Sequence, residues 1–579
     1  MFKSRISKVQ EYLTKNNIDA YVCFISDDHG SEYIMPTYKT IAFLSSFTGS
    51  AGTLLVLKDA AYLWTDGRYF LQASKQLEVS GCQLKKIGED ETIIEFIKEN
   101  VNSLAFDFKV ASTSFVNAVL KAKGDIKLVH EEKLINDIWV DRPKLSKKKI
   151  YYLPENVVYK SANKKCQKTL SHIRYQKDYS VLVSALDDIA YLLNARGKDI
   201  PYNPVFMSFM LLSKVEGKET YTLYICSSKL DEDTKKYLKQ NNINVKPYNK
   251  IYSDVSKLNH RIYIDANKTN YMLNIMIKHK KEVVLYPTLD KAIKRKIDIE
   301  ETKKAHLKDA VAMCKFIYYI KNNVGKKKMD ELSVSNYLKK LRFKQGAYDL
   351  SFSTICGYKG NGAIIHYSAT KESAAVIEND GFLLVDSGGQ YHYGTTDITR
   401  TIALNNITDE MKFHFTLVLK AHIDLSLAVF DQTTTDAELD LITRKPMWEH
   451  NLDYNHGTGH GVGHILNVHE GPQSIRHNKV NPTFMKKGMV TSNEPGLYFA
   501  NKYGIRHENE MLCIKIDDKH LGFEPITYVP FDKDAIDVNM LDEKERKWLN
   551  NYHELVYNKV SKYLNEKERD FLKEITKEI

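Results

Sequence analysis

The sequence predicts a multidomain chain in which two α/β segments are followed by an α+β segment. At roughly 150 residues per domain, the 579 residues are enough for three or four domains. Helical and strand patterns alternate in a similar order through residues 1–145 and again through residues 150–295. Residues 296–579 instead carry short strands and most of the unusual polar motifs. A hydrophobic content of 43% is sufficient for folded cores.

The first segment, residues 1–145, begins with an amphipathic helix and continues through strands. Ile6, Val9 and Leu13 would share one face of that helix. Three apolar runs of strand type and one helical run follow: DAYVCFI (19–25), TLLVL (53–57), AAYLWT (60–65) and ETIIEFIKENV (91–101). The polar, proline-bearing run DRPKLSKKK (141–149) then reads as a linker.

The second segment, residues 150–295, repeats this order of patterns. We expect a helix, two strands and a further helix: SVLVSALDDIAYLLNA (180–195), FMSFMLL (206–212), TYTLYICS (220–227) and DTKKYLKQNN (233–242). The two segments are therefore interpreted as diverged copies of one α/β unit.

The third segment, residues 296–579, opens on a long helix and continues through short strands. The expected strands are AAVI (374–377), GFLLVDSGG (381–389), ITRTIAL (398–404), MVTSNEPGLYF (489–499) and MLCIKI (511–516). This pattern predicts an α+β fold with a mainly antiparallel sheet. Near the end of the chain, residues 542–564 form a charged helix with an apolar stripe, which we expect to pack on the domain.

Composition excludes several classes of protein. The net charge of +11 comes from lysines spread along the chain, without a basic block, and no nucleic-acid-binding motif accompanies them. The seven cysteines are scattered and form no C-x-x-C pair, as in proteins of reducing compartments. No window approaches the ~20 apolar residues of a membrane span, and the N-terminus lacks the apolar core of a signal peptide. We expect a cytoplasmic protein with no nucleic-acid or membrane partner.

The stretch HGTGHGVGHILNVHE (456–470) holds four histidines. His456, His460 and His464 are four residues apart, which on a helix would place them on one face as in zinc-binding helices. Four glycines are interleaved among them, and each costs a helix about 1 kcal/mol relative to alanine. The stretch is thus either a metal-binding helix or a glycine-rich loop, and carboxylates elsewhere must decide.

Carboxylates stand at the ends of several predicted strands. Asp386 ends one strand and Asp397 begins another, while Glu494 follows a third. Glu508 and Glu510 precede MLCIKI, and we interpret Glu510 as a salt-bridge acid rather than a further ligand. Burying several carboxylates together is costly unless a cation neutralises them. Two aspartates, two glutamates and a histidine set among glycines therefore indicate a cation site.

Together these residues resemble a known family. HGTGHGVG, VHEGP, NEPG, GIRHEN, Asp386, Asp397 and GAIIHY (362–367) are similar to the pita-bread metallopeptidases. SDDHGSEYI (26–34), FTGSAGT (47–53), YLWTDGRYFLQA (62–73), NPVF (203–206) and AHLKDAVA (305–312) resemble the long, three-domain cytosolic aminopeptidase P. This likeness implies two creatinase-like N-terminal α/β domains, at 1–145 and 150–295. A pita-bread catalytic domain with a C-terminal helical extension would then occupy 296–579.

The resemblance implies a set of metal ligands. They are Asp386, Asp397, His460, Glu494 and Glu508, which would hold two divalent ions, with Asp397 and Glu494 bridging. Four carboxylates and one imidazole suit Mn²⁺, with Co²⁺ or Zn²⁺ as alternatives. On this view the histidine stretch is a glycine-rich strand and turn in which only His460 binds metal.

The resemblance also implies residues that contact substrate. His366 and His469 would steady the oxyanion or the adjacent carbonyl, and His456 would shape the pocket. Arg68 would bind the substrate, from its own or a partner subunit. No counterpart role is implied for His464 or His507.

The implied activity is removal of the N-terminal residue from peptides with proline second, by a homodimer. A hydroxide bridging the two ions would attack the scissile carbonyl, and Glu494 would carry the proton. Prolidase, which cleaves X-Pro dipeptides, is an alternative that normally lacks the middle domain. Methionine aminopeptidase is usually a single domain. A metal-free pita-bread binding module is a third alternative, but it predicts missing ligands, and all five are present.

Overall fold

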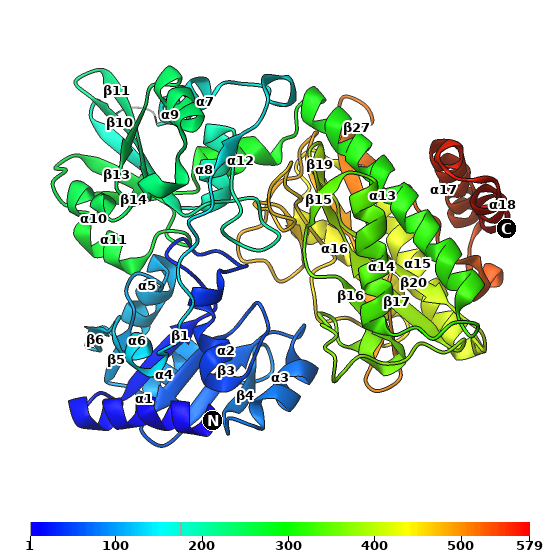
Figure 1. Ribbon diagram of the computed structural model, residues 1–579, viewed down its shortest axis with the longest axis horizontal. Coiled ribbons are helices and arrows are strands. Elements are labelled where there is room, and N and C mark those ends of the chain that lie inside the picture. The colour runs from blue at the N-terminus through cyan, green and yellow to red at the C-terminus, as the bar shows by residue number, and fades with distance from the viewer. Residues whose placement is uncertain (1, 174–175) are drawn as a thin grey trace. The chain divides into compact units, whose positions relative to one another are not determined.

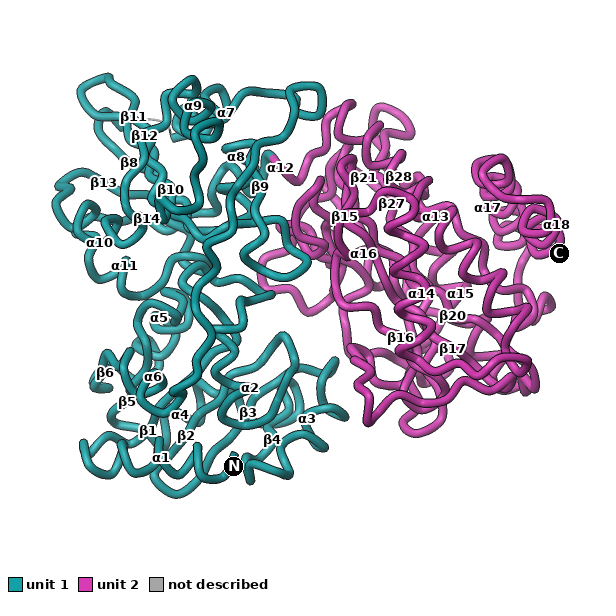
Figure 2. Tube along the Cα trace, in the orientation of Figure 1, with its two compact units in different colours: residues 1–290 teal, residues 291–579 magenta. Residues whose placement is uncertain are grey.

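The computed structural model describes residues 2–173 and 176–579 (Figure 1). The chain divides into two compact units, Met1–Asp290 and Lys291–Ile579 (Figure 2). Each unit has buried apolar clusters of its own. None of the described helices is long and apolar enough to cross a membrane.

The first half of unit 1 is a six-stranded sheet in the order β4-β3-β2-β1-β5-β6 with helices on both faces. Its elements are α1 (Phe2–Asn16), β1 (Ala20–Phe24), α2 (Thr40–Ser45), β2 (Thr53–Leu57), β3 (Ala61–Thr65), α3 (Phe70–Leu77), β4 (Gln83–Lys86), α4 (Ile93–Asn100), β5 (Ser103–Phe106), α5 (Thr113–Ala122), β6 (Lys127–His130) and α6 (Leu134–Ile138). Successive residues of a strand point to opposite faces. Tyr21 and Cys23 therefore join the core that α1 covers, whereas Ala20 and Val22 join the core that α4 and α5 cover.

The second half of unit 1 repeats this sheet in the order β12-β11-β10-β8-β13-β14. Its elements are β7 (Tyr151–Tyr152), α7 (Ala162–Ser171), β8 (Tyr179–Val183), α8 (Leu186–Leu193), β9 (Ala195–Arg196), β10 (Ser208–Val215), β11 (Lys218–Ile225), α9 (Glu232–Gln240), β12 (Ile243–Lys246), α10 (Lys250–Val255), β13 (Arg261–Ile264), α11 (Tyr271–Met276) and β14 (Lys280–Glu282). The first strand of each sheet is antiparallel to one neighbour and parallel to the other. The recurrence predicted from the sequence is therefore present in the topology.

One predicted helix in this half is wrong in part. The stretch 180–195 begins as the strand β8, and its helix starts only at Leu186. β8 is fully buried between β10 and β13, so its continuous apolar run reflects a central strand. Periodicity alone does not separate such a run from a buried helix.

Unit 2 is an α+β fold whose strand pairs are all antiparallel among the described residues. Its helices are α13 (Lys296–Asn323), α14 (Glu331–Lys344), α15 (Asp409–Ser426), α16 (Asp436–Trp448), α17 (Glu543–Val560) and α18 (Glu566–Ile575), and α12 (Tyr286–Ala292) leads into it. Its strands are β15 (Ala347–Leu350), β16 (Ile355–Tyr358), β17 (Phe382–Ser387), β18 (Gly389–Tyr391), β19 (Gly394–Thr395), β20 (Ile398–Ala403), β21 (Phe430–Asp431), β22 (Gly459–His460), β23 (Ser474–Ile475), β24 (Val490–Asn493), β25 (Gly496–Phe499), β26 (Tyr503–Arg506), β27 (Asn509–Lys515) and β28 (His520–Pro525).

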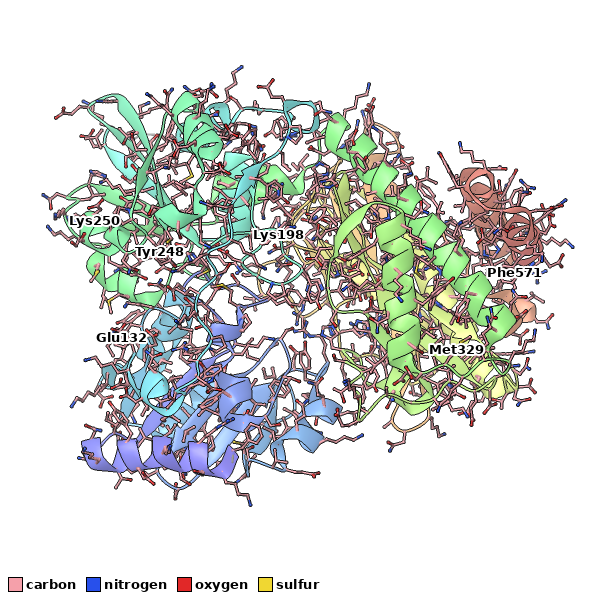
Figure 3. All side chains as sticks on the ribbon, in the orientation of Figure 1. Glu132, Lys198, Tyr248, Lys250, Met329 and Phe571 are labelled. Carbon is pink, nitrogen blue, oxygen red and sulfur yellow. The ribbon has the colours of Figure 1, made fainter. Side chains whose placement is uncertain are left out.

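The C-terminal helices pack on this unit, as the apolar stripe predicted. Leu549 and Val556 of α17 and Leu572 of α18 belong to the same core cluster as α13 and α15. Phe571, labelled on α18 in Figure 3, meets Tyr318 of α13 edge to face, with ring centroids 5.5 Å apart.

The predicted strand AAVI (374–377) does not form. Ile377 donates its backbone N–H to Met329, and Ala375 donates to the carboxylate of Glu331 at 2.8 Å. These bonds attach the segment to the start of α14 instead of to a sheet edge. Only Val376 makes an isolated bridge, with Asp330.

Candidate metal centre

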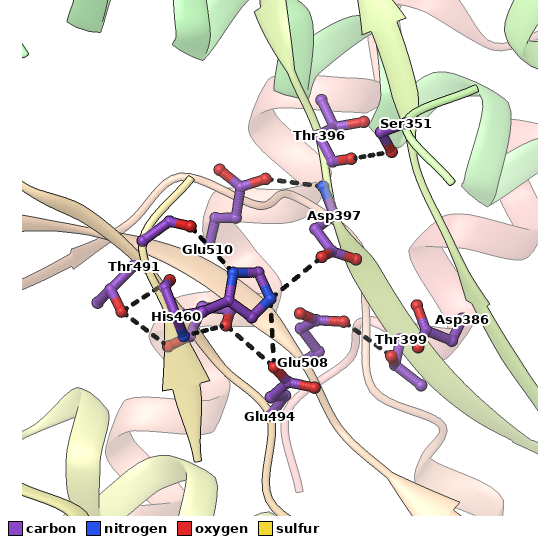
Figure 4. Close-up of polar contacts among 12 residues, drawn as sticks. Ser351, Asp386, Thr396, Asp397, Thr399, His460, Thr491, Glu494, Glu508 and Glu510 are labelled. Atoms are coloured by element: carbon purple, nitrogen blue, oxygen red, sulfur yellow. Dashed lines mark hydrogen bonds and ion pairs between the residues drawn. The ribbon is translucent and has the colours of Figure 1, made fainter. Parts of the chain in front are cut away.

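Three sheets of unit 2 deliver the five predicted ligands to one place. Asp386 lies near the end of β17 and Asp397 immediately precedes β20, which pairs with β17. Glu494 follows β24, and Glu508 precedes β27, which pairs with β24. His460 ends the short strand β22. Figure 4 shows the side chains of these residues pointing toward one another.

The ligand atoms fall into overlapping groups in which all atoms lie within 4.8 Å of one another. Asp386, Asp397 and Glu508 form one group, and His460, Glu494 and Glu508 form another. The His460 Nε2 atom is 3.5 Å from Asp397 Oδ2 and 3.3 Å from Glu494 Oε1. Glu508 belongs to both of these groups, and a third group joins Asp397, His460 and His469.

The electrostatics of the cluster reflect buried carboxylates packed around one imidazole. Burial raises the pKa of Asp386 to about 7, although Arg506 opposes the shift. Burial and Asp397 raise the pKa of Glu508 well above its usual range. Burial alone would lower the pKa of His460, but its bond to Asp397 and the Glu494 charge outweigh it and raise that pKa to about 9. All three pKa values are raised because buried carboxylates repel one another's negative charge while they stabilise the protonated imidazole.

The donor set fits divalent metal ions. The buried oxygens Asp386 Oδ1 and Asp397 Oδ1 have no hydrogen-bond partner. Buried carboxylate oxygens are normally satisfied, and a cation would satisfy both. Four carboxylates with one imidazole form a hard, oxygen-rich set of the kind that binds Mn²⁺.

Hydrogen bonds orient the ligands from behind. Arg506 donates to Asp386 Oδ2 at 2.7 Å, and Thr399 donates to Glu508 Oε2 at 2.7 Å. The Nδ1 atom of His460 lies 3.0 Å from the carbonyl oxygen of Gly461, which leaves Nε2 facing the carboxylates. A bond of this type fixes the imidazole tautomer that can bind a metal.

The glycines of the histidine stretch permit close backbone contacts. A Cβ atom at Gly459 would lie 2.0 Å from the carbonyl oxygen of Ser492, and one at Gly461 would lie 2.1 Å from that of Glu470. The stretch is a short strand and turn, so the zinc-helix interpretation is wrong. The strands can then approach one another closely enough for His460 to reach the carboxylates.

The other predicted site residues are placed as follows. The His469 ring centroid is 4.3 Å from that of His460. His456 Nε2 lies 2.8 Å from the hydroxyl of Tyr498, which in turn accepts from Arg506 at 2.7 Å. His366 follows Ile365, whose carbonyl oxygen accepts from Arg506 at 3.3 Å. Arg68 belongs to unit 1, where it bonds Asp66 at 2.8 Å and lies 3.6 Å from Glu32.

Sequence reasoning missed two residues of the site and left two histidines without a role. Arg506 binds Asp386 and also donates to the hydroxyl of Tyr498, and the only signal for Arg506 was its place in GIRHEN. His507 is buried against Phe415 and Phe531, with ring centroids 4.3 and 5.5 Å away. His464 lies beside Thr302 at 3.2 Å. Both histidines therefore belong to the packing around the site.

Family models cover nearly the whole chain. The model of metallopeptidase family M24 matches residues 300–515, and that of its C-terminal region matches residues 519–579. Two models of the creatinase/prolidase N-terminal domain match residues 5–138 and 141–298. The chain therefore belongs to metallopeptidase family M24.

Several similar proteins carry the name of one kind of peptidase. A probable Xaa-Pro aminopeptidase P of Botryotinia fuckeliana is 35% identical over 96% of this chain and 90% of the relative. Xaa-Pro aminopeptidase 1 of Dictyostelium discoideum is 35% identical over 98% and 95%. The X-prolyl aminopeptidase of Caenorhabditis elegans, described as a cytosolic enzyme with a di-nuclear active site, superposes with a TM-score of 0.95 at 30% identity and covers 100% of both chains.

Proposed function

We propose that this chain is a metal-dependent aminopeptidase that removes the N-terminal residue from peptides whose second residue is proline. The observation that carries the proposal is the cluster of four carboxylates around His460 in an M24 fold. The end-to-end likeness to Xaa-Pro aminopeptidases supports the specificity.

The cluster would hold two divalent ions, with Mn²⁺ favoured and Co²⁺ or Zn²⁺ as alternatives. Asp386, Asp397, His460, Glu494 and Glu508 are the proposed ligands. Asp397 and Glu494 are the ligands that we propose are shared between the two ions. Such ions, when bound, polarise a carbonyl group and lower the pKa of water toward neutrality.

Glu494 is the proposed carrier of the proton from the attacking water to the leaving nitrogen. Its side chain is 17% exposed, whereas that of Asp397 is 5% exposed, so Glu494 is the more accessible to substrate. Ser492 donates to its Oε1 atom at 3.2 Å, and the backbone N–H of Glu494 is held by Thr458 at 2.7 Å. These bonds leave the carboxylate fixed but reachable.

The remaining predicted residues would bind substrate. His469 stands beside His460 and would donate to the carbonyl oxygen as negative charge develops there. His366 would contact the residue on the far side of the scissile bond, and His456 would line the pocket through its contact with Tyr498. Arg68 would bind the peptide from its own or a partner subunit.

The domain division also remains a proposal. We infer two creatinase-like domains at 1–145 and 150–295 and a catalytic domain at 296–579, which the ranges of the family models support. A cytoplasmic location is proposed because the nematode neighbour is described as cytosolic, and a homodimer is proposed from the family resemblance alone.

The test is hydrolysis of Arg-Pro-Pro with added Mn²⁺, beside Arg-Ala-Ala and the dipeptide Arg-Pro. We expect arginine to be released from Arg-Pro-Pro alone. Cleavage of only the dipeptide would identify a prolidase, and no cleavage with no bound metal would identify a binding module. Glu494→Gln should lower kcat by about 10²–10⁴-fold, while His464→Gln, which changes a histidine beside Thr302 of α13, should leave kcat unchanged.

A further inference from the structure

A buried acid–imidazole pair lies directly behind one of the proposed ligands. Glu510 is on β27, two residues beyond Glu508, and its side chain is fully buried. His306 is on α13, within the motif AHLKDAVA, and is 2% exposed. The Nε2 atom of His306 lies 3.0 Å from Glu510 Oε2. The proposed function gives this pair no role.

The second oxygen of Glu510 faces the metal centre. Glu510 Oε1 accepts the backbone N–H of Asp397 at 2.7 Å (Figure 4). Glu510 is itself fixed by its backbone, because its N–H donates to Thr527 at 2.9 Å and its carbonyl oxygen accepts from Ile526 at 3.0 Å. A chain of contacts therefore runs from α13 through a rigid strand to the backbone of Asp397.

The pair is not an extension of the ligand cluster. Among the described residues, the groups whose ligand atoms converge include Asp397 and Glu508 but not Glu510. A buried carboxylate is unfavourable unless its partners compensate for the hydration that it loses. An apolar side chain at the same position on β27 would not carry this cost. The compensation at Glu510 comes from His306 and from the N–H of the ligand Asp397.

We infer that Glu510 is a positioning residue that holds Asp397 through its backbone N–H, and that His306 holds Glu510. The inference rests on the proposed function, since it assumes that Asp397 binds metal. Partners behind metal ligands commonly contribute 10–100-fold to metal affinity. The pair would therefore contribute to metal affinity directly, and to hydrolysis only through the bound metal.

The test is Mn²⁺ titration of metal-free, full-length protein by calorimetry, together with the visible absorption spectrum of the Co²⁺ form. Glu510→Ala should weaken the affinity for at least one ion by about 10–100-fold and change the Co²⁺ spectrum. Glu510→Gln should restore most of the affinity, because its amide oxygen can accept the Asp397 N–H. A role in packing alone does not predict the spectral change, which is therefore the readout that separates the two roles.

Two further variants complete the design. Glu524→Gln is the matched control. Glu524 lies on β28, is partly exposed, and pairs at 2.6 Å with Lys303, which is on the same helix as His306. The Glu524→Gln variant should bind Mn²⁺ as the wild type does. His306→Ala should weaken Mn²⁺ binding, and it serves as the test if Glu510→Ala does not fold.

The two levels of inference fail differently. Wild-type affinity and an unchanged Co²⁺ spectrum in Glu510→Ala, or in His306→Ala if it is the variant that folds, would overturn the positioning role alone. Absence of metal binding in the wild type would overturn the proposed function itself.

Discussion

Asp386 is the residue at which the need for a cation is clearest. Burial raises its pKa from 3.8 to about 7, and the neighbouring charges of Asp397 and Glu494 add to the shift that Arg506 opposes. The folded protein without metal thus holds a proton that the unfolded chain has already released between these values. A group of this kind stabilises the fold at low pH and loses that contribution as the pH rises through its folded pKa.

The pH dependence of stability should reveal this proton. In EDTA, the wild type should lose unfolding free energy relative to Asp386→Asn between about pH 4 and pH 7, by up to about 1.4 kcal/mol per pH unit. His460, with a pKa of about 9, is present in both proteins and should lower the unfolding free energy of both as the pH rises further. Urea unfolding of both proteins at several pH values is the measurement. If the unfolding free energies of the two proteins changed in parallel with pH, the raised pKa of Asp386 would be contradicted.

Among elements, the segment between β16 and β17 depends on one buried acid at the start of α14. Glu331 is fully buried and accepts from Tyr358 N at 2.7 Å, Ala375 N at 2.8 Å and the Tyr367 hydroxyl at 2.8 Å. These donors lie on both sides of His366. The helix N-terminus also favours a carboxylate there. Glu331 therefore holds together the two ends of the segment that carries His366, a proposed substrate-binding residue.

Removal of this acid should separate substrate binding from metal binding. Glu331→Ala leaves buried donors unpaired, at a cost of about 1–3 kcal/mol each, and should raise KM for Arg-Pro-Pro. Mn²⁺ affinity should be unchanged, because none of the five proposed ligands lies in this segment. Steady-state kinetics and calorimetry measure the two effects. Glu372→Ala, an exposed acid of the same segment, is the control, and a fall in Mn²⁺ affinity alone would contradict the assignment.

The elements also show how far the sequence could predict this fold. Alternating apolar patterns located most strands, and the amphipathic helix with Ile6, Val9 and Leu13 buries that face. The sequence pattern failed to predict the secondary structure where contacts with distant residues determine it. Residues 374–377 are apolar and extended in character, but Met329 and Glu331 bind their backbone. Likewise, β8 reads as a helix until its neighbours β10 and β13 are known.

For the site, motif residues were predicted and their supports were not. The five proposed ligands, which the family resemblance implied, lie close together in the structure. Glu510 was expected to be a salt-bridge acid, and His306 is the partner that the structure supplies. That pairing joins residues 204 positions apart, since 510 − 306 = 204. No local pattern encodes a contact of this kind.

At the scale of the whole molecule, the proposed functions are divided between the two units. The five ligands lie in unit 2, whereas Arg68 lies in unit 1 beside Asp66 and Glu32. Arg68→Ala should therefore lower kcat/KM for Arg-Pro-Pro by about tenfold or more, the loss expected for one charged hydrogen bond. Mn²⁺ binding should not change.

Lys58→Ala is the control for Arg68. Lys58 pairs with Asp19 in the same unit at 3.7 Å, and its removal should leave kcat/KM unchanged. Equal activities of the wild type and Arg68→Ala would remove Arg68 from the proposed substrate-binding residues.

The order of the ligands along the chain has a consequence for how such an enzyme matures. Asp386 leaves the ribosome long before Glu508, the residue common to both groups of ligands. A nascent chain therefore presents isolated acids with little affinity for any ion, and the paired centre exists only once β27 has closed against β24. Metal binding is then a late event in biosynthesis, because the ions bind tightly only to chains in which the catalytic unit has already folded.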